Sequence, residues 1–253
     1  MTAEVQLQPQ QPLVPDGESA QMGLFEHLDE LRRRLFVSAF ALVIGTIAGV
    51  AVATPVLEFL RKPYGEAFLV MDPTGGVVQY FRVAIMVGAS LSIPVITYEI
   101  LMFILPGLTG KEKKLLVMSL PPITILFIIG VAFAWFILIP PALNFLVGFQ
   151  PTIFHAQWTA DHYLGFVTSL LFWMGVAFET PLVFFVLSLF AVIQSRQLIH
   201  HWRIAVVGAA IAAAVITPTV DPVNMMLVMG PLLALYVLSI ALVNIGSRII
   251  KDR

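Results

Sequence analysis

Long apolar runs separated by short polar segments dominate the chain from about residue 35 onward. An α-helix rises about 1.5 Å per residue, so about 20 apolar residues cross the roughly 30 Å of hydrocarbon in a bilayer. Candidate membrane helices cover approximately residues 35–53, 77–105, 115–147, 163–189, 204–216 and 223–245. The pattern therefore predicts an all-α integral membrane protein with six transmembrane helices, of which the fifth and sixth are short.

Two of these runs differ from the usual membrane length. The run at 204–216 would rise only about 20 Å, so that its helix would thin the bilayer locally or lean on its neighbours. The run at 115–147 would rise about 50 Å and must project beyond the membrane. The connections at about 55–76 and 148–162 are long enough to form two structured outer loops.

The first 22 residues are polar and contain no apolar core, so they match neither a secretory signal nor an Arg-rich transit peptide. We expect residues 1–22 to form a disordered tail and residues 23–253 to form a single six-helix membrane domain. No internal repeat of the kind found in many transporters is apparent.

Composition and charge support this topology. Hydrophobic residues make up 59% of the chain and charged residues 11%, too little polar surface for a soluble globule. With six spans and the N-terminus inside, 11 of the 14 Lys and Arg residues lie on the cytoplasmic side, and only Arg61, Lys62 and Arg82 lie outside. Positive charge is retained in the cytoplasm, so we expect both termini to be cytoplasmic.

Several classes of function are disfavoured. The chain has no Cys, no paired-ligand spacing of His, and no catalytic motif of the G-x-S-x-G or H-E-x-x-H type, so no metal, cofactor or enzymatic chemistry is expected. No basic run is long enough to follow a nucleic-acid backbone.

A charged segment precedes the first apolar run. In this segment Asp29 lies four residues before Arg33, and Glu30 lies four residues before Arg34. Such helical pairs are usually weak, self-neutralising surface pairs. A carboxylate at a membrane boundary is nevertheless also suited to accept a guanidinium in a two-pronged hydrogen bond. Both interpretations are open at this point.

Short motifs recur at regular places along the chain. They are His27-Leu28-x-Glu30-Leu31-Arg32, Phe103-Ile104-x-Pro106-Gly107-Leu108 followed by Lys111-Glu112, Gly130-x-x-Phe133-x-Trp135, Gly175-x-x-Phe178-Glu179-x-Pro181 and Thr217-Pro218-x-x-Asp221. In order and spacing this set resembles the TatC family, the polytopic receptor subunit of the twin-arginine translocase, over about residues 24–245.

The resemblance implies transport of folded proteins across the bacterial cytoplasmic (inner) membrane or its thylakoid equivalent, driven by the protonmotive force. Signal peptides with two adjacent arginines would bind at the cytoplasmic face, and single-span proteins of the TatA and TatB type would then dock. Self-association within the complex is also expected. Gly45 and Gly49 fit the small-residue dimer pattern, although one such match in a Gly-rich membrane chain is weak evidence.

The resemblance also implies site residues. Glu30 and Glu112 would hold the two guanidiniums, Arg32 would orient Glu30 or contact the neighbouring loop, and Phe103 and Pro106 would shape the site. Two carboxylates for two guanidiniums is chemically sensible.

Other residues concern the membrane interior and the last connection. Glu179 lies deep in the fourth run, where a carboxylate is costly and must face a cavity or a partner. It and the slim helix around Gly208 would contact a partner helix, or else pack within the chain. Pro218 and Asp221 suit a structural turn. An alternative class is a secondary ion or solute transporter that uses Glu179.

Overall fold

The computed structural model describes residues 16–63, 65, 67–105, 110–150, 152–153, 157–217 and 221–251, without the side chains of 16–25, 111–112 and 248–251. The elements are α1 (Asp16–Arg61), α2 (Gly75–Ile104), α3 (Gly110–Phe133), the π-helix η1 (Ala134–Leu138), α4 (Ile139–Gly148), α5 (Ala160–Leu189), α6 (Ser195–His200), α7 (Trp202–Ile216) and α8 (Pro222–Lys251). In the described residues the one extended pairing is an isolated bridge between Leu69 and Thr159. The prediction of an all-α fold is confirmed.

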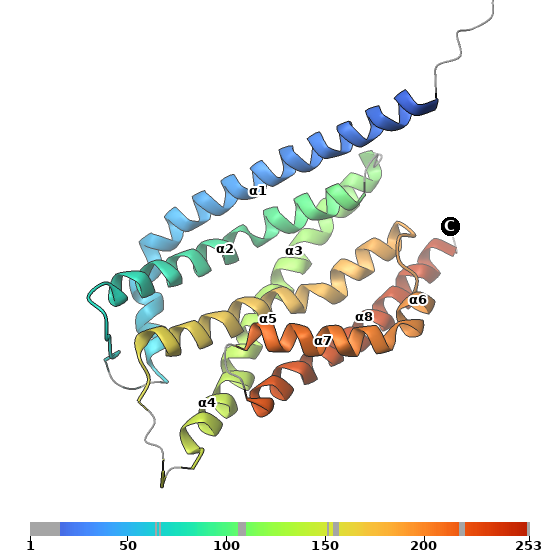
Figure 1. Ribbon diagram of the computed structural model, residues 1–253. Helices are drawn as coiled ribbons and strands as arrows, with labels where there is room; N and C mark the ends of the chain where they lie inside the picture. The colour runs from blue at the N-terminus through green and yellow to red at the C-terminus, as the bar shows by residue number, and fades with distance from the viewer. Residues whose placement is uncertain are drawn as a thin grey trace, which may run out of the picture.

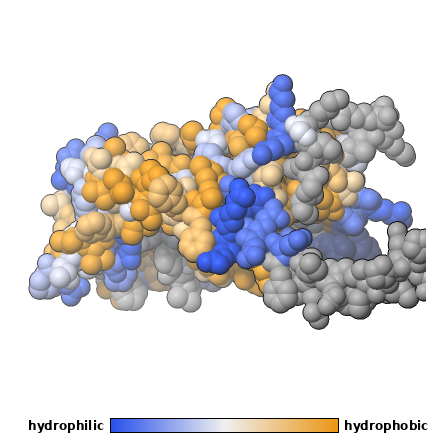
Figure 2. Space-filling view, turned by 90° about the horizontal axis from the view of Figure 1, so that it is seen from above, coloured by the Kyte–Doolittle hydropathy of each residue, from blue (hydrophilic) through white to orange (hydrophobic). Residues whose placement is uncertain are grey.

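Within the described residues, five helical stretches are long and apolar enough to cross a membrane, and α7 is a shorter apolar helix of 15 residues. One of the five is the continuous helical stretch Lys113–Gly148, which comprises most of α3 together with η1 and α4. At about 1.5 Å per residue α7 rises about 22 Å, as its apolar run predicts. Figure 2 shows hydrophobic surface over the middle of the visible face, with hydrophilic residues toward the ends.

Two boundaries differ from the sequence prediction. The last helix is not short, because α8 has 30 residues and continues past its apolar part to Lys251. Hydropathy marks only the part of a helix that contacts lipid, whereas backbone hydrogen bonds continue into the polar flank. Likewise α1 begins at Asp16, well before the apolar run that starts at about residue 35, and the helix includes residues 16–22.

Two packing arrangements organise the bundle. Helices α1 and α2 form an antiparallel pair, and α5 contacts α2, α3, α7 and α8 (Figure 1). Close approach of the first pair depends on small residues, because a Cβ added at Gly88 would lie 2.5 Å from the Thr46 backbone nitrogen. Gly45 and Gly49 are buried in the same seam. They therefore pack within the chain and are not available for dimerisation.

The bundle has two polar ends. The Glu30 end is where α1 begins and where α2, α5 and α8 finish, while the Arg82 end is where α2 and α5 begin (Figure 1). At the Arg82 end the connections before α2 and before α5 meet, because the backbone N–H of Ala160 donates to the carbonyl of Leu69 at 2.8 Å. The hydroxyl of Tyr163 donates to the carbonyl of Leu60 at 2.9 Å and ties α5 to α1.

Candidate functional site

Two carboxylates from different helices meet one guanidinium at the Glu30 end. Arg34 donates from Nε to Oε1 of Glu30 at 3.0 Å and from Nη1 to Oε2 of Glu99 at 2.9 Å. Glu30 precedes Arg34 by one helical turn on α1, and the antiparallel course of α2 brings Glu99 to the same level. The predicted helix pair between Glu30 and Arg34 is thus present, and Glu99 extends it to the neighbouring helix.

This cluster is partly shielded from water. The side chain of Arg34 is 17% exposed, that of Glu99 13% and that of Glu30 32%. Ion pairs in such an environment are screened less than pairs on an open surface. Glu30 is the most accessible of the three side chains.

The cluster forms one wall of a polar pocket of about 530 Å³. Its lining residues come from α1, α2 and the start of α3, and they are Asp29, Glu30, Arg33, Arg34, Val37, Tyr98, Glu99, Met102 and Lys113. Three acids and three cations stand in this set, so their formal charges cancel. A cationic ligand entering the pocket must therefore compete with cations that are already there.

The other residues predicted at this end have different surroundings. The rings of His27 and Phe103 stack with centroids 4.5 Å apart and join the ends of α1 and α2. The guanidinium of Arg32 lies over the ring of Phe36, 5.7 Å from its centroid. Arg34, and not Arg32, is thus the arginine that contacts Glu30.

Two predicted residues fall outside what the structure describes at this end. They are Pro106 and the side chain of Glu112. The helix that carries Glu112 begins at Gly110, and the next residue, Lys113, lines the pocket. Sequence reasoning missed Glu99 as a site residue. An acid near the end of an apolar helix was visible, but its partner Arg34 is 65 positions away in the chain.

Glu179 lies inside the bundle, on α5. Its side chain is among the buried ones at 5% exposure, and Oε2 accepts a hydrogen bond from the hydroxyl of Thr97 on α2 at 2.9 Å. Its other oxygen, Oε1, is buried without a hydrogen-bond partner in the described part of the chain. The carboxyl group is therefore packed against α2 and retains an unused acceptor.

Of the residues predicted in and after α7, Gly208 lies on the protein surface and Asp221 lies directly before α8. Gly208 is exposed, and a Cβ added there would meet nothing within 4 Å. It lies on a face of α7 with the exposed apolar side chains of Ile204, Val207, Ile211 and Val215. Asp221 has a structural contact, since its carboxylate accepts from the backbone N–H of Asn224 at 2.7 Å at the start of α8. Pro218 lies outside the described residues.

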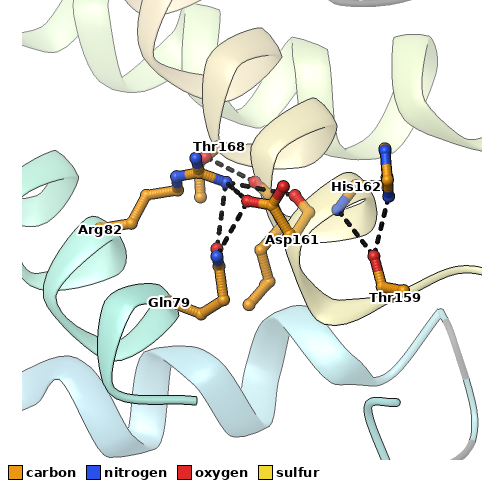
Figure 3. A network of polar contacts seen from close by, with 7 residues as sticks. Gln79, Arg82, Thr159, Asp161, His162 and Thr168 are labelled. Atoms are coloured by element: carbon orange, nitrogen blue, oxygen red, sulfur yellow. Dashed lines mark hydrogen bonds and ion pairs between the residues drawn. The ribbon is translucent and has the colours of Figure 1, made fainter. Parts of the chain in front are cut away.

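A second polar cluster lies at the Arg82 end (Figure 3). Nη1 of Arg82 donates to Oδ1 of Asp161 at 2.7 Å and to Oε1 of Gln79 at 3.0 Å, and Nε2 of Gln79 donates to the same Asp161 oxygen at 2.9 Å. The cluster links α2 to the start of α5. Among the residues that the structure describes, no three His, Cys, Asp or Glu side chains are grouped in a way that could hold a metal ion.

A bundle of long apolar helices with a charged pocket at one end defines a multi-pass helical membrane protein. The family model described as "Sec-independent protein translocase protein (TatC)" matches residues 26–231. The chain therefore belongs to the TatC family, as the motifs predicted. It is a component of a protein translocase and, as predicted, not an enzyme.

Individual relatives agree with this assignment. The chain is 37% identical over 224 residues to the Sec-independent protein translocase protein TatC of Synechocystis, a match that covers 88% of this chain and 87% of the relative. It is 37% identical over 245 residues to the chloroplastic TATC of Oryza sativa, covering 96% and 68% respectively. A crystal structure of the twin-arginine translocase receptor TatC superposes with a TM-score of 0.77 at 35% identity, over 88% of this chain and all of that one.

Proposed function

We propose that the pocket at the Glu30 end binds the arginine pair of twin-arginine signal peptides. One observation carries this proposal: Glu30 and Glu99, from two helices, already bind a guanidinium, that of Arg34. A guanidinium offers several N–H donors in one plane, so it can serve both carboxylates at once, whereas the ammonium of lysine is a point charge without that plane. The pocket is suited to arginine for the same reason.

Arg34 then acts as an internal occupant of the site. A peptide arginine that pairs with Glu30 takes over a contact that Arg34 makes in the free protein, and Arg34 keeps its contact with Glu99. This exchange leaves neither of the two partly shielded carboxylates without a cation, which would be costly in a poorly screened environment. Glu112 is the second acid in the proposal and would receive the other peptide arginine, with Arg32, Phe103 and Pro106 around it.

Six membrane spans with both termini in the cytoplasm are part of the proposal. The start of α1 and the end of α8 lie at the same end of the bundle (Figure 1). The short helix α7 packs against α8. If α7 crosses the bilayer, 11 of the 14 Lys and Arg residues are cytoplasmic, in agreement with the positive-inside rule. The bacterial cytoplasmic membrane is the proposed location, although some relatives are chloroplastic.

Recruitment of single-span partners of the TatA and TatB type is assigned to the membrane helices. The exposed face of α7 around Gly208 allows another helix to approach closely, because small residues bring backbones together. Glu179 is the polar group assigned to the same role, with one acceptor oxygen left unused inside the bundle. Export of folded proteins would then be driven by the protonmotive force.

Binding of a labelled twin-arginine peptide to the purified protein in detergent tests the receptor assignment. We expect the double variant Glu30→Gln/Glu112→Gln to lose binding by about tenfold or more, because two charge-assisted hydrogen-bonding sites are removed. Glu58→Gln is the matched control, since Glu58 is an exposed acid at the other end of α1. Unchanged affinity in the double variant, or equal affinity for a peptide with two lysines, would contradict the proposal.

The alternative is a secondary ion or solute transporter that uses Glu179. Membership of a protein translocase family favours the receptor, and Glu179 does not line the charged pocket at the Glu30 end. A proton-coupled flux of a solute into liposomes containing only this protein would favour the transporter instead.

A further inference from the structure

The ion pair at the Arg82 end uses only part of its hydrogen-bonding capacity. All the hydrogen bonds of the Arg82 guanidinium to described residues leave from Nη1, which points to Asp161 and Gln79 (Figure 3). Nε and Nη2 donate to no described residue. Both acceptor contacts of the Asp161 side chain use Oδ1, so Oδ2 has no partner among the described residues.

Gln79 fixes the orientation of this pair. Its amide accepts from Arg82 and donates to Asp161, so the two charged groups are held side by side and cannot turn independently. Gly165 allows the arrangement, because a Cβ at that position would lie 3.0 Å from Nη1 of Arg82. The pair remains accessible, with side-chain exposures of 40% for Arg82 and 59% for Asp161.

A groove of about 420 Å³ continues from this pair along the surface between α2 and α5. It begins at Arg82, and its other lining residues are Ile85, Met86, Ala89, Gly165, Thr168, Ser169 and Phe172. From Arg82 to Ala89 the groove follows about 10 Å of helix α2 toward the middle of the bundle. Its far part, beside Ala89 and Phe172, is apolar. At its start Arg82 lies in the wall of the groove, and Asp161, which is not itself a lining residue, is paired with Arg82 at 2.7 Å.

We propose that this groove binds a membrane phospholipid with an ethanolamine-type headgroup. The lipid phosphate would accept hydrogen bonds from Nε and Nη2 of Arg82, and the primary ammonium would donate to Oδ2 of Asp161. One acyl chain would lie along the apolar floor beside Ala89 and Phe172. An adjacent cation and anion complement a zwitterion that carries a phosphate and an ammonium.

Charge complementarity excludes the other common headgroups as preferred ligands. A glycerol headgroup has the phosphate but offers Asp161 only neutral hydroxyls, so it lacks the cation that would pair with this carboxylate. A choline headgroup has a quaternary ammonium that cannot donate a hydrogen bond. The proposal is independent of the receptor function, because the groove and the charged pocket lie at opposite ends of α2.

Native mass spectrometry of the purified protein with an equimolar mixture of phosphatidylethanolamine, phosphatidylcholine and phosphatidylglycerol of the same acyl chains tests the proposal. We expect the wild type to retain phosphatidylethanolamine about threefold to fivefold over the other two, the factor that an exposed ion pair supplies. Arg82→Gln and Asp161→Asn should each abolish this preference. Arg61→Gln, which removes an exposed cation from α1, should preserve it.

A second pair of variants leaves Arg82 and Asp161 in place, so that any effect on lipid retention cannot come from a fold weakened by loss of the ion pair. Ala89→Trp fills the groove and should reduce lipid retention, whereas Ala241→Trp, at an exposed alanine of α8, should not. Equal retention of the three lipids by the wild type would overturn the proposal. So would a preference for phosphatidylethanolamine that survives Asp161→Asn or Ala89→Trp.

Discussion

Arg34 has two effects on the pocket. It neutralises Glu30 and Glu99 by forming ion pairs with both, and it competes for them with any arginine that enters. We expect Arg34→Gln to raise the affinity for a twin-arginine peptide by about threefold to tenfold, since Glu30 and Glu99 are then free to receive the ligand. Fluorescence anisotropy with a labelled peptide measures the change.

A control separates this exchange from a simple change of net charge. Arg33 also lines the pocket but makes no ion pair with a described residue, so Arg33→Gln removes the same charge without freeing a carboxylate. Its effect should be smaller than that of Arg34→Gln. A drop in affinity for Arg34→Gln, as large as that for Glu30→Gln, would mean that Arg34 organises the site and does not compete for it.

Glu179 allows a second prediction at the residue level. Glu179→Gln retains an oxygen that can accept from Thr97, so the protein should keep the thermal stability of the wild type in detergent. Export of a twin-arginine precursor in cells should nevertheless fall, because the group can no longer ionise or change its protonation state. Thr97→Val, which removes only the internal hydrogen bond, should lower stability by about 1 kcal/mol.

The two readouts decide the role of this acid. Wild-type export by Glu179→Gln across a range of external pH would exclude a titrating function. Equal losses of stability in Glu179→Gln and Thr97→Val would assign Glu179 to packing alone.

Among the helices, the seam between α1 and α2 depends most on the absence of side chains. Gly88→Ala should destabilise the protein by about 1–3 kcal/mol, because the new methyl group would overlap the backbone of α1. Gly76→Ala is the control on the same helix, with nothing within 4 Å of the added Cβ. It should leave stability unchanged or slightly raised. Thermal unfolding in detergent, followed by circular dichroism, compares the two.

Helix positions were predictable to the extent that they contact lipid. The apolar run at 163–189 anticipated α5 to within three residues at its start, because hydropathy and helix coincide there. The apolar run at 223–245 did not anticipate where α8 ends, since the polar end of that helix carries no apolar signal. The use of Gly45 and Gly49 was also undetermined, because a small-residue pattern does not say whether the partner helix belongs to the same chain.

The candidate site was predictable only in part for a related reason. The contact between Glu30 and Arg34 follows from helical spacing, but Glu99 enters through the tertiary pairing of α1 with α2. A sequence shows that an acid stands near the end of a helix. It does not show which arginine in another helix lies opposite.

At the scale of the molecule, the short helix α7 decides the topology. The chain contains no cysteine, so single cysteines can be introduced at Asp72, at Gln157, at Gln194 or after the last residue without background labelling. If α7 crosses the bilayer, a membrane-impermeant maleimide added outside cells should label positions 72 and 157 but not 194 or the C-terminal cysteine. Labelling of the C-terminal cysteine together with position 72 would instead show that α7 does not cross.

The central position of α5 has a consequence for biosynthesis. Membrane helices enter the bilayer in order of synthesis, so the pair of α1 and α2 can assemble as soon as both are inserted. The seam between α5 and α8, where Gly246 lies against Ser188, can close only after the last helix has been made. Newly made chains should thus pass through a stage in which α5 lacks its final neighbour, and substitutions in this seam should expose the protein to membrane quality-control proteases at that stage.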